Sequence, residues 1–195
     1  YAAAHERPAL ALARAAALAG ARRVVSVSIL GAEPAAHNAC LASKGRADQT
    51  LLAGAVPATV LRVPMVLGPG ELGAAALRAQ ATAPFSFLVR GGRTLEQPID
   101  RRDLVRALLL ALSAPGAAAL LDLAGPEALS HRALVERLGA LLGRRPRILP
   151  LPLALVNALA FGFEHVAAEP PLTRAMLGVL EHDDLAPVPR QDRTR

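Results

Sequence analysis

The hydrophobic positions of the chain follow two alternating patterns, which predict helices and strands in turn. Long runs of alanine and leucine with interspersed polar residues are typical of helices, and short β-branched runs bounded by glycine or proline are typical of strands. The predicted helices are 8–19, 36–52, 72–81, 104–113, 131–143 and 153–161, and the predicted strands are 23–28, 59–63, 85–89, 119–123 and 147–149. Because parallel strands need crossover connections, this alternation predicts an α/β fold with a mostly parallel sheet.

Local polar residues indicate where some of these elements begin. Asp103 and Ser130 each precede a predicted helix, and their side-chain oxygens can accept the free amide hydrogens of its first turn. The glycines and prolines of residues 64–70 predict a loop. We expect the segment after His182 to be mobile, because it is rich in charged residues and proline.

The composition argues against a nucleic-acid-binding module. Aromatic residues make up only 3% of the 195 residues, whereas modules that stack bases need exposed aromatic rings. The net charge of +6 comes from arginines that are scattered along the chain rather than clustered. A nucleic-acid site would require an arginine-lined groove that this distribution does not predict, so we expect no nucleic-acid partner.

Cysteine content and hydrophobic run lengths indicate a cytoplasmic protein without a transmembrane segment. The chain has one cysteine, which cannot form an internal disulfide, and no charged-then-apolar leader opens it. The longest uncharged stretches, 107–121 and 148–163, are shorter than the roughly 20 residues that span a bilayer. The second stretch is predicted to form a buried core helix, with attachment to a membrane or a partner as the alternative.

Lys44 is the only lysine, and it follows the only cysteine, Cys40, by one helical turn. Since the chain has 22 basic residues and one of them is lysine, the other 21 are arginine. Taken alone, Lys44 is explained as a chance survivor on a solvated helix face. The alternative is that this position needs a lysine for a chemical reason, such as a proton donor placed one turn before it.

Five collinear stretches of the sequence resemble one protein family. They are Arg22–Gly31, Ser43–Asp48, Val60–Pro69, Gln97–Asp103 and Leu123–Ser130. Their order and spacing resemble the atypical or extended short-chain dehydrogenases/reductases. Within these, the chain is most similar to the NAD(P)H-binding, NAD-dependent epimerase/dehydratase-like branch, which includes the nucleotide-binding accessory subunit of respiratory complex I.

The resemblance implies the carboxyl-terminal portion of a Rossmann-like doubly wound parallel sheet, together with a small α/β substrate or docking subdomain. We expect residues 1–70 to be the second half of the dinucleotide-binding domain. Residues 71–182 would form a carboxyl-terminal substrate or docking region interleaved with the sheet, and residues 183–195 a mobile tail. The glycine-rich turn that would hold a pyrophosphate is absent from the sequence, so we expect the chain alone to bind a dinucleotide poorly.

The resemblance also implies roles for residues near the lone lysine. Lys44 matches the lysine that hydrogen-bonds the nicotinamide ribose, and Cys40 occupies the position of the proton-exchanging tyrosine. A thiol can ionise, but its sulfur lies too close to the backbone to replace a phenol oxygen. Cys40 therefore stands at a catalytic position that has become degenerate. The simpler interpretation is that Cys40 packs as a small buried hydrophobic residue. Ser28 is a candidate catalytic helper, for which a strand-end hydrogen bond is an equal explanation.

The same resemblance implies a cofactor and a class of partner. Lys44 and Ser26, together with Val63, Pro64 and Met65, are expected to border NAD or NADP, with NADPH favoured. The substrate would be a small carbonyl compound or a sugar nucleotide. One hypothesis is an oxidoreductase or epimerase-like protein that is catalytically impaired at Cys40. The other is a non-catalytic accessory or assembly subunit that binds NADPH and docks peripherally on a membrane complex. No metal site is predicted.

Overall fold

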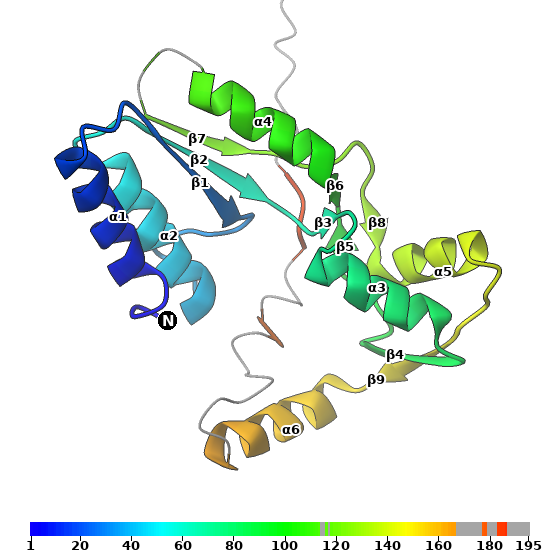
Figure 1. Ribbon diagram of the computed structural model, residues 1–195. Coiled ribbons are helices and arrows are strands. Elements are labelled where there is room, and N and C mark those ends of the chain that lie inside the picture. The colour runs from blue at the N-terminus through cyan, green and yellow to red at the C-terminus, as the bar shows by residue number, and fades with distance from the viewer. Residues whose placement is uncertain (114–115, 117, 167–176, 179–182, 187–195) are drawn as a thin grey trace, which may run out of the picture.

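The computed structural model describes residues 1–113, 116, 118–166, 177–178 and 183–186, and its central feature is a parallel three-stranded sheet. The strand order is β1 (Val24–Ile29), β2 (Ala58–Val63) and β7 (Ala119–Asp122), as Figure 1 shows. Both pairings are parallel, with Val24 opposite Ala58 and Thr59 opposite Ala119. The predicted parallel α/β fold is therefore confirmed.

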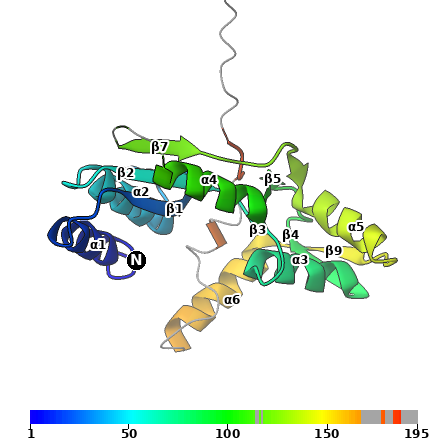
Figure 2. The ribbon, with the colours of Figure 1, turned by 45° about the horizontal axis from the view of Figure 1, so that its top comes forward.

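Helices cover both faces of this sheet. α1 (Glu6–Leu18) and α2 (Ala39–Leu52) lie on one face, and α4 (Arg101–Ser113) lies on the other (Figures 1 and 2). All six residues of β2 are buried, because this strand is covered on both sides. Along β2, Val60 packs into a cluster with residues of α1 and α2, while Leu61 and Val63 pack with Leu104 of α4. This alternation follows from the two-residue period of a strand.

A smaller α/β unit follows the middle strand. Here β4 (Phe85–Val89) pairs in parallel with β9 (Arg147–Leu151). α3 (Leu72–Thr82) and α5 (His131–Leu141) pack on this pair through Leu77, Leu88 and Val135, among other residues. α6 (Leu153–Val166) follows β9 and contributes the buried Val156 to a separate cluster. The helix predicted for this segment is therefore present. It is not the buried core helix that was expected, because Leu155 is 50% exposed and Phe161 is 49% exposed.

Several short elements differ from the prediction. The predicted loop 64–70 contains the two-residue strand β3 (Val66–Leu67), which pairs with β6 (Ile99–Asp100). β5 (Leu95–Glu96) pairs antiparallel with β8 (Leu129–Ser130). Such short strands have no hydrophobic period of their own, so the sequence pattern could not predict them.

The start of α4 corrects the prediction for Asp103. The helix begins at Arg101, and the Asp100 carboxylate accepts a hydrogen bond from the Arg102 amide at 2.6 Å. Asp103 lies inside the first turn and forms an exposed ion pair with Arg106. Ser130, by contrast, caps α5 as predicted, since its hydroxyl accepts from the Ala133 amide at 3.1 Å.

Part of the predicted carboxyl-terminal tail contacts the fold. The Asp184 amide donates to the Leu95 carbonyl at 2.8 Å, and the Gln97 amide donates to the Asp184 carbonyl at 3.1 Å. Residues 183–186 therefore lie against β5. Residues 187–195, which share the prediction of mobility, lie outside the described residues.

Candidate functional site

A cavity of about 240 Å³ lies where α1 and α2 meet β1. Its polar lining comes from His5, Ser26, Ser28, Lys44 and Asp48, and the remaining lining is mostly apolar. Ser28 lies next to the carboxyl end of β1, and Ser26 lies in the middle of the strand. Ligands of open parallel sheets bind at the carboxyl ends of the strands, so this cavity is the candidate functional site.

The N-cap of α2 determines where the helix begins and therefore where Lys44 lies along it. The Asn38 side chain accepts hydrogen bonds from the Cys40 amide at 2.9 Å and the Leu41 amide at 3.2 Å. This N-cap satisfies two of the amide groups that a helix start leaves without a partner. Lys44 therefore lies one turn into a helix whose first residue is well defined.

Gly45, which follows Lys44, lets α2 pass directly against the loop after β1. A Cβ atom at this position would lie 2.3 Å from the carbonyl carbon of Glu33 and 2.5 Å from the Pro34 nitrogen. Backbone atoms cannot yield to such a contact. The glycine thus holds the Lys44 turn of α2 close to the end of β1.

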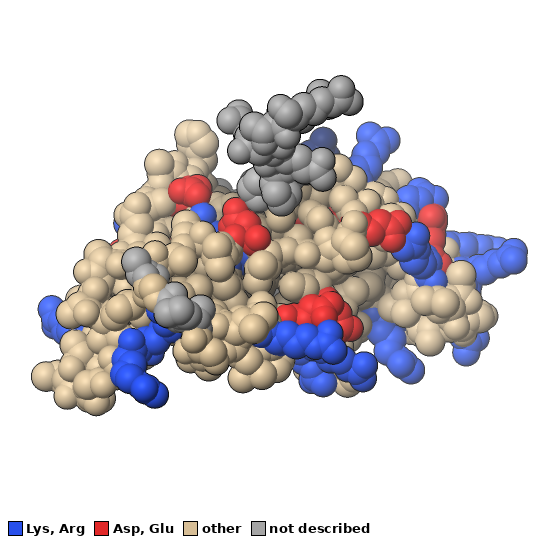
Figure 3. Space-filling view, turned by 90° about the horizontal axis from the view of Figure 1, so that it is seen from above, with Lys and Arg blue, Asp and Glu red and all other residues tan. Residues whose placement is uncertain are grey.

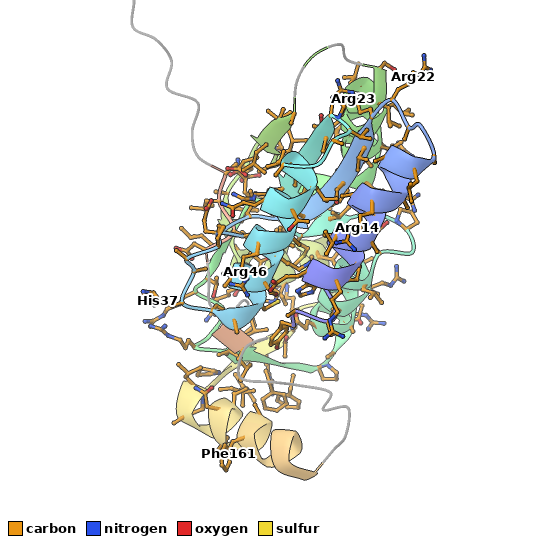
Figure 4. All side chains as sticks on the ribbon, turned by 90° about the vertical axis from the view of Figure 1, so that its left-hand side faces the viewer. Arg14, Arg22, Arg23, His37, Arg46 and Phe161 are labelled. Carbon is orange, nitrogen blue, oxygen red and sulfur yellow. The ribbon has the colours of Figure 1, made fainter. Side chains whose placement is uncertain are left out.

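Lys44 has no ion pair or hydrogen bond with any residue that the structure describes, although its side chain is half-buried. Burial of an ammonium group is costly unless an anion or hydrogen-bond acceptor compensates it. Figure 4 looks onto α1 and α2. Arg46, the other basic residue of α2, forms an ion pair with Glu6 at 2.8 Å. Lys44 is therefore the basic group of α2 that is available to a ligand.

Behind the cavity, a buried ion pair joins α2 to β2. The Arg62 guanidinium donates to Asp48 at 2.9 Å, and it also reaches the exposed Glu33 carboxylate at 2.7 Å. Burial raises the pKa of the Asp48 carboxyl, and hydrogen bonds from Arg62 and from the Ser28 hydroxyl oppose that shift. Ser28 is itself buried. The network therefore anchors Ser28 in the lining, at the strand end where a ligand would contact it.

His5 completes the polar lining from the start of α1. Its Nδ1 lies 2.7 Å from the hydroxyl oxygen of Ser43, which is almost fully buried in α2. Burial lowers the pKa of His5, and the positive charge of Lys44 lowers it further. His5 is thus a titratable group beside Lys44, on a helix that precedes β1 in the chain.

The structure brings together only some of the residues that the sequence predicted. Lys44, Ser26 and Ser28 line the cavity together. Cys40 is half-buried and is not among the lining residues, and its carbonyl accepts a hydrogen bond from Ser43.

Val63, Pro64 and Met65, the other predicted cofactor neighbours, are not among the residues that line this cavity. Val63 is buried in the cluster beneath α4, and Pro64 is also buried. Met65 lines a second cavity, of about 330 Å³, together with Gln80, Glu96 and His131. There the His131 ring lies 2.7 Å from Glu96 and 2.8 Å from Gln80.

Sequence reasoning missed His5, Ser43 and Asp48. Nothing in the sequence around His5 distinguishes it, because its partner Ser43 is 38 positions away. Asp48 carries a usable signal: it lies four residues after Lys44, on the same face of a helix as the lysine. An acidic residue on the buried face of a helix predicts a buried partner, which here is Arg62.

The parallel sheet with helices on both faces defines a Rossmann-like α/β fold. No family model matches the chain. Among curated proteins, it is 28% identical over 152 residues to NADH dehydrogenase [ubiquinone] 1 alpha subcomplex subunit 9, mitochondrial, of Arabidopsis thaliana. The match covers 72% of this chain and 36% of that protein.

Solved structures show the same fold. A dTDP-glucose 4,6-dehydratase of Streptomyces venezuelae, solved with NAD, superposes with a TM-score of 0.69 at 19% identity, covering 78% of this chain and 54% of its own. The UDP-glucose 4-epimerase of Thermus thermophilus, in complex with NAD, gives a TM-score of 0.62 at 19% identity, with 74% and 56% covered. MoeE5, in complex with UDP-glucose and NAD, gives 0.65 at 20% identity, with 92% and 65% covered.

These likenesses confirm the Rossmann-like fold and the resemblance to the epimerase/dehydratase-like branch. The chain spans about a third of the length of the curated relative and between about half and two thirds of the solved structures. Within the part of the chain that the structure describes, every helix is too short or too polar to cross a bilayer.

Proposed function

We propose that the chain forms the nicotinamide side of an NAD(P)-binding site in an oxidoreductase or epimerase-like protein. The observation that carries this proposal is the half-buried Lys44, which has no ion pair among the described residues and shares a cavity with Ser26 and Ser28. An unpaired ammonium group beside two hydroxyl groups of one parallel strand, one of them next to its carboxyl end, fits the ribose hydroxyls of a dinucleotide. Similar folds solved with NAD support the choice of ligand.

The residues of the site would act by binding and orientation. Lys44 would donate hydrogen bonds to the ribose, and Ser28 would hold a substrate oxygen at the end of β1. The nicotinamide ring, when bound, supplies the hydride chemistry. The Asp48–Arg62 ion pair would fix Ser28 from behind, as supporting groups commonly do in binding sites.

We further propose that activity is reduced because Cys40 stands where the family has its tyrosine. The Cys40 side chain lies outside the cavity lining, at the second residue of α2. A thiol there cannot reach a substrate held beside Lys44. The substrate class would be a small carbonyl compound or a sugar nucleotide, because similar folds have been solved with UDP-glucose and with related sugar nucleotides.

The second candidate is a non-catalytic accessory or assembly subunit that binds NADPH and attaches to the periphery of a membrane complex. The similarity to the Arabidopsis NADH dehydrogenase subunit and the position of Cys40 support it. An exposed apolar strip on β4 and β9, formed by Phe85, Phe87 and Leu149, would suit contact with a partner. A cytoplasmic or membrane-peripheral location fits both candidates.

A nucleic-acid partner remains the least supported alternative. On the face shown in Figure 3, basic side chains are spread from one end to the other and acidic side chains lie among them. A groove lined by arginine alone, which such a partner needs, is not seen on that face.

Titration of the complete protein, as its gene encodes it, with NADPH and NADH tests the proposal. We expect Lys44→Met to weaken binding about tenfold, since hydrogen bonds to a charged donor contribute about 1.5 kcal/mol or more. Arg46→Met is the matched control, because it removes an exposed cation two residues along the same helix. Equal affinity of the wild-type protein and Lys44→Met would contradict the proposal.

Turnover then separates the two candidates. An epimerase-like or oxidoreductase protein converts UDP-glucose or dTDP-glucose in the presence of NAD. An accessory subunit binds NADPH with the same dependence on Lys44 and converts neither sugar nucleotide.

A further inference from the structure

His5 shares the candidate site with Lys44, although 38 residues separate it from its partner on α2. It occupies the N-cap position of α1 and lines the cavity beside Ser28 and Lys44. Its Nδ1 lies 2.7 Å from the Ser43 hydroxyl. The His5 ring is therefore held at the site by a contact between α1 and α2.

The two hydrogen-bond partners of Ser43 bear on which ring nitrogen of His5 carries the proton. The Cys40 carbonyl, 3.0 Å from the Ser43 hydroxyl oxygen, can only accept a hydrogen bond. With the single hydroxyl proton of Ser43 on that carbonyl, the Ser43 oxygen accepts from Nδ1–H of His5 at 2.7 Å. The other ring nitrogen, Nε2, then holds the lone pair. Nε2 makes no hydrogen bond with a described residue. A base oriented by a third group through its far nitrogen is the arrangement that proton-transfer sites use.

The surroundings of His5 favour its neutral form. Burial lowers the pKa of the ring from its ordinary 6.5, and the positive charge of Lys44 on α2 lowers it further. Glu6 acts in the opposite direction and is the smallest of these influences. The Tyr1 ring stacks on His5 at a centroid distance of 6.0 Å. At pH 7 the ring is therefore a neutral base.

We propose that His5 is the proton-exchanging group of this site and takes the role that Cys40 cannot fill. This proposal rests on the proposed function, because it requires a bound nicotinamide dinucleotide. Alcohol oxidation would break the substrate O–H bond, with its proton passing to Nε2 of His5. The substrate C–H bond would break as its hydride reduces the oxidised dinucleotide, a C=O bond would form, and the imidazolium would return its proton to water.

The first test is structural and needs no cofactor. Nitrogen-15 NMR of the His5 ring should show the Nδ1–H tautomer at pH 7 in the wild-type protein. Ser43→Ala removes the acceptor for Nδ1–H and should let the two tautomers mix. A wild-type ring that carries its proton on Nε2 would overturn the proposal.

The second test is kinetic and uses the complete protein with NAD and UDP-glucose or dTDP-glucose. We expect His5→Asn to lower kcat by roughly 10²- to 10⁴-fold, the usual range for loss of a general acid or base, with NADH affinity changed less than about threefold. Tyr1→Phe is the matched control: it keeps the stacked ring, removes the hydroxyl and should change kcat less than about twofold. Ser43→Ala should lower kcat by a smaller factor than His5→Asn and provides a second variant should His5→Asn fold poorly.

The outcomes distinguish failure of this inference from failure of the proposed function. A wild-type protein that binds NADH but converts neither sugar nucleotide, or a His5→Asn protein with unchanged kcat, overturns the role of His5 and leaves the cofactor site standing. A wild-type protein that does not bind the dinucleotide overturns both. Loss of kcat in Tyr1→Phe as large as in His5→Asn would assign proton exchange to the tyrosine instead.

Discussion

At the residue scale, most of the predictions about the site came from two residues, a lysine and a cysteine. Lys44 stands out because 21 of the 22 basic residues are arginine, and the structure places it at a cavity without an ion pair to any described residue. Cys40 stands out because of its spacing to Lys44. His5 and Ser43 could not be predicted, since hydrogen bonds between residues 38 positions apart arise from the packing of α1 on α2.

The buried ion pair behind the site makes a prediction about stability. Asp48→Asn should lower the free energy of unfolding by about 3 kcal/mol, because it leaves the buried Arg62 with only the exposed Glu33 as a charged partner among the described residues. Urea denaturation measures the change. Asp103→Asn removes an exposed pair with Arg106 and should cost about 0–1 kcal/mol. Equal costs in the two variants would mean that burial of the Asp48 pair has no energetic consequence.

At the element scale, long helices and strands were predictable and short ones were not. The hydrophobic runs identified β1, β2, β4, β7 and β9. β3, β5, β6 and β8 have two residues each, and they exist only because a partner strand from elsewhere in the chain lies beside them. The same limit explains the cap of α4: both Asp100 and Asp103 are reasonable caps, and the pairing of β6 with β3 decides where the helix begins.

The N-cap of α2 makes a second prediction. Asn38→Ala should lower the free energy of unfolding by about 1 kcal/mol, because two amides at the start of the helix lose their acceptor. Glu71→Ala is the control, since Glu71 holds the N-cap position of α3 without a side-chain cap. A cost of Asn38→Ala no greater than that of Glu71→Ala would show that the cap does not stabilise α2.

A third prediction concerns Gly45, where replacing a helical glycine by alanine should lower the stability of the protein instead of raising it. Alanine inside a helix normally stabilises it by about 1 kcal/mol relative to glycine. Gly45→Ala should instead destabilise the protein, because the new Cβ would meet the backbone of Glu33 and Pro34. Gly73→Ala in α3 should be milder, since its nearest contact is the flexible side chain of Met65. Thermal unfolding of both variants gives the comparison, and a higher melting temperature for Gly45→Ala would contradict the close approach.

At the scale of the whole molecule, the resemblance predicted the fold more closely than the hydrophobic pattern did. The pattern indicated an α/β protein, the five collinear stretches indicated which kind of α/β fold, and the comparisons agree with that kind. The positions of Val63, Pro64 and Met65 could not follow from that resemblance alone. After β2, Met65 lies against Gly73 of α3 and lines the second cavity, not the one that holds Lys44.

The contact of residues 183–186 with β5 predicts a pH-dependent attachment. Burial and the neighbouring Glu96 raise the pKa of Asp184 from its ordinary 3.8 to about 6. Because the folded form binds this proton more readily, its contribution to stability is complete below about pH 3.8 and is lost as the pH rises through about 6. The Gln97 amide, which donates to the Asp184 carbonyl, should be better protected from hydrogen exchange at about pH 5 than at about pH 7.5 after correction for intrinsic rates.

Substitution at the neighbouring aspartates provides the control for that measurement. Asp184→Asn should remove most of the difference in protection between the two pH values. Asp183→Asn keeps an oxygen that can accept from the Leu95 amide, and it should leave the difference in place. If the protection of the Gln97 amide still differs between the two pH values in Asp184→Asn, a group other than Asp184 is responsible for the pH dependence.

The central claim is that these 195 residues form the nicotinamide side of a dinucleotide site around Lys44. The most direct measurement is NMR titration of the chain with reduced nicotinamide mononucleotide and, separately, with ADP-ribose. We predict that the mononucleotide shifts the amide signals of Ser26, Ser28 and Lys44 and that ADP-ribose leaves them unchanged, since the sequence has no glycine-rich turn for the pyrophosphate. Shifts caused by ADP-ribose alone, or no shift at these residues with millimolar mononucleotide, would contradict the claim.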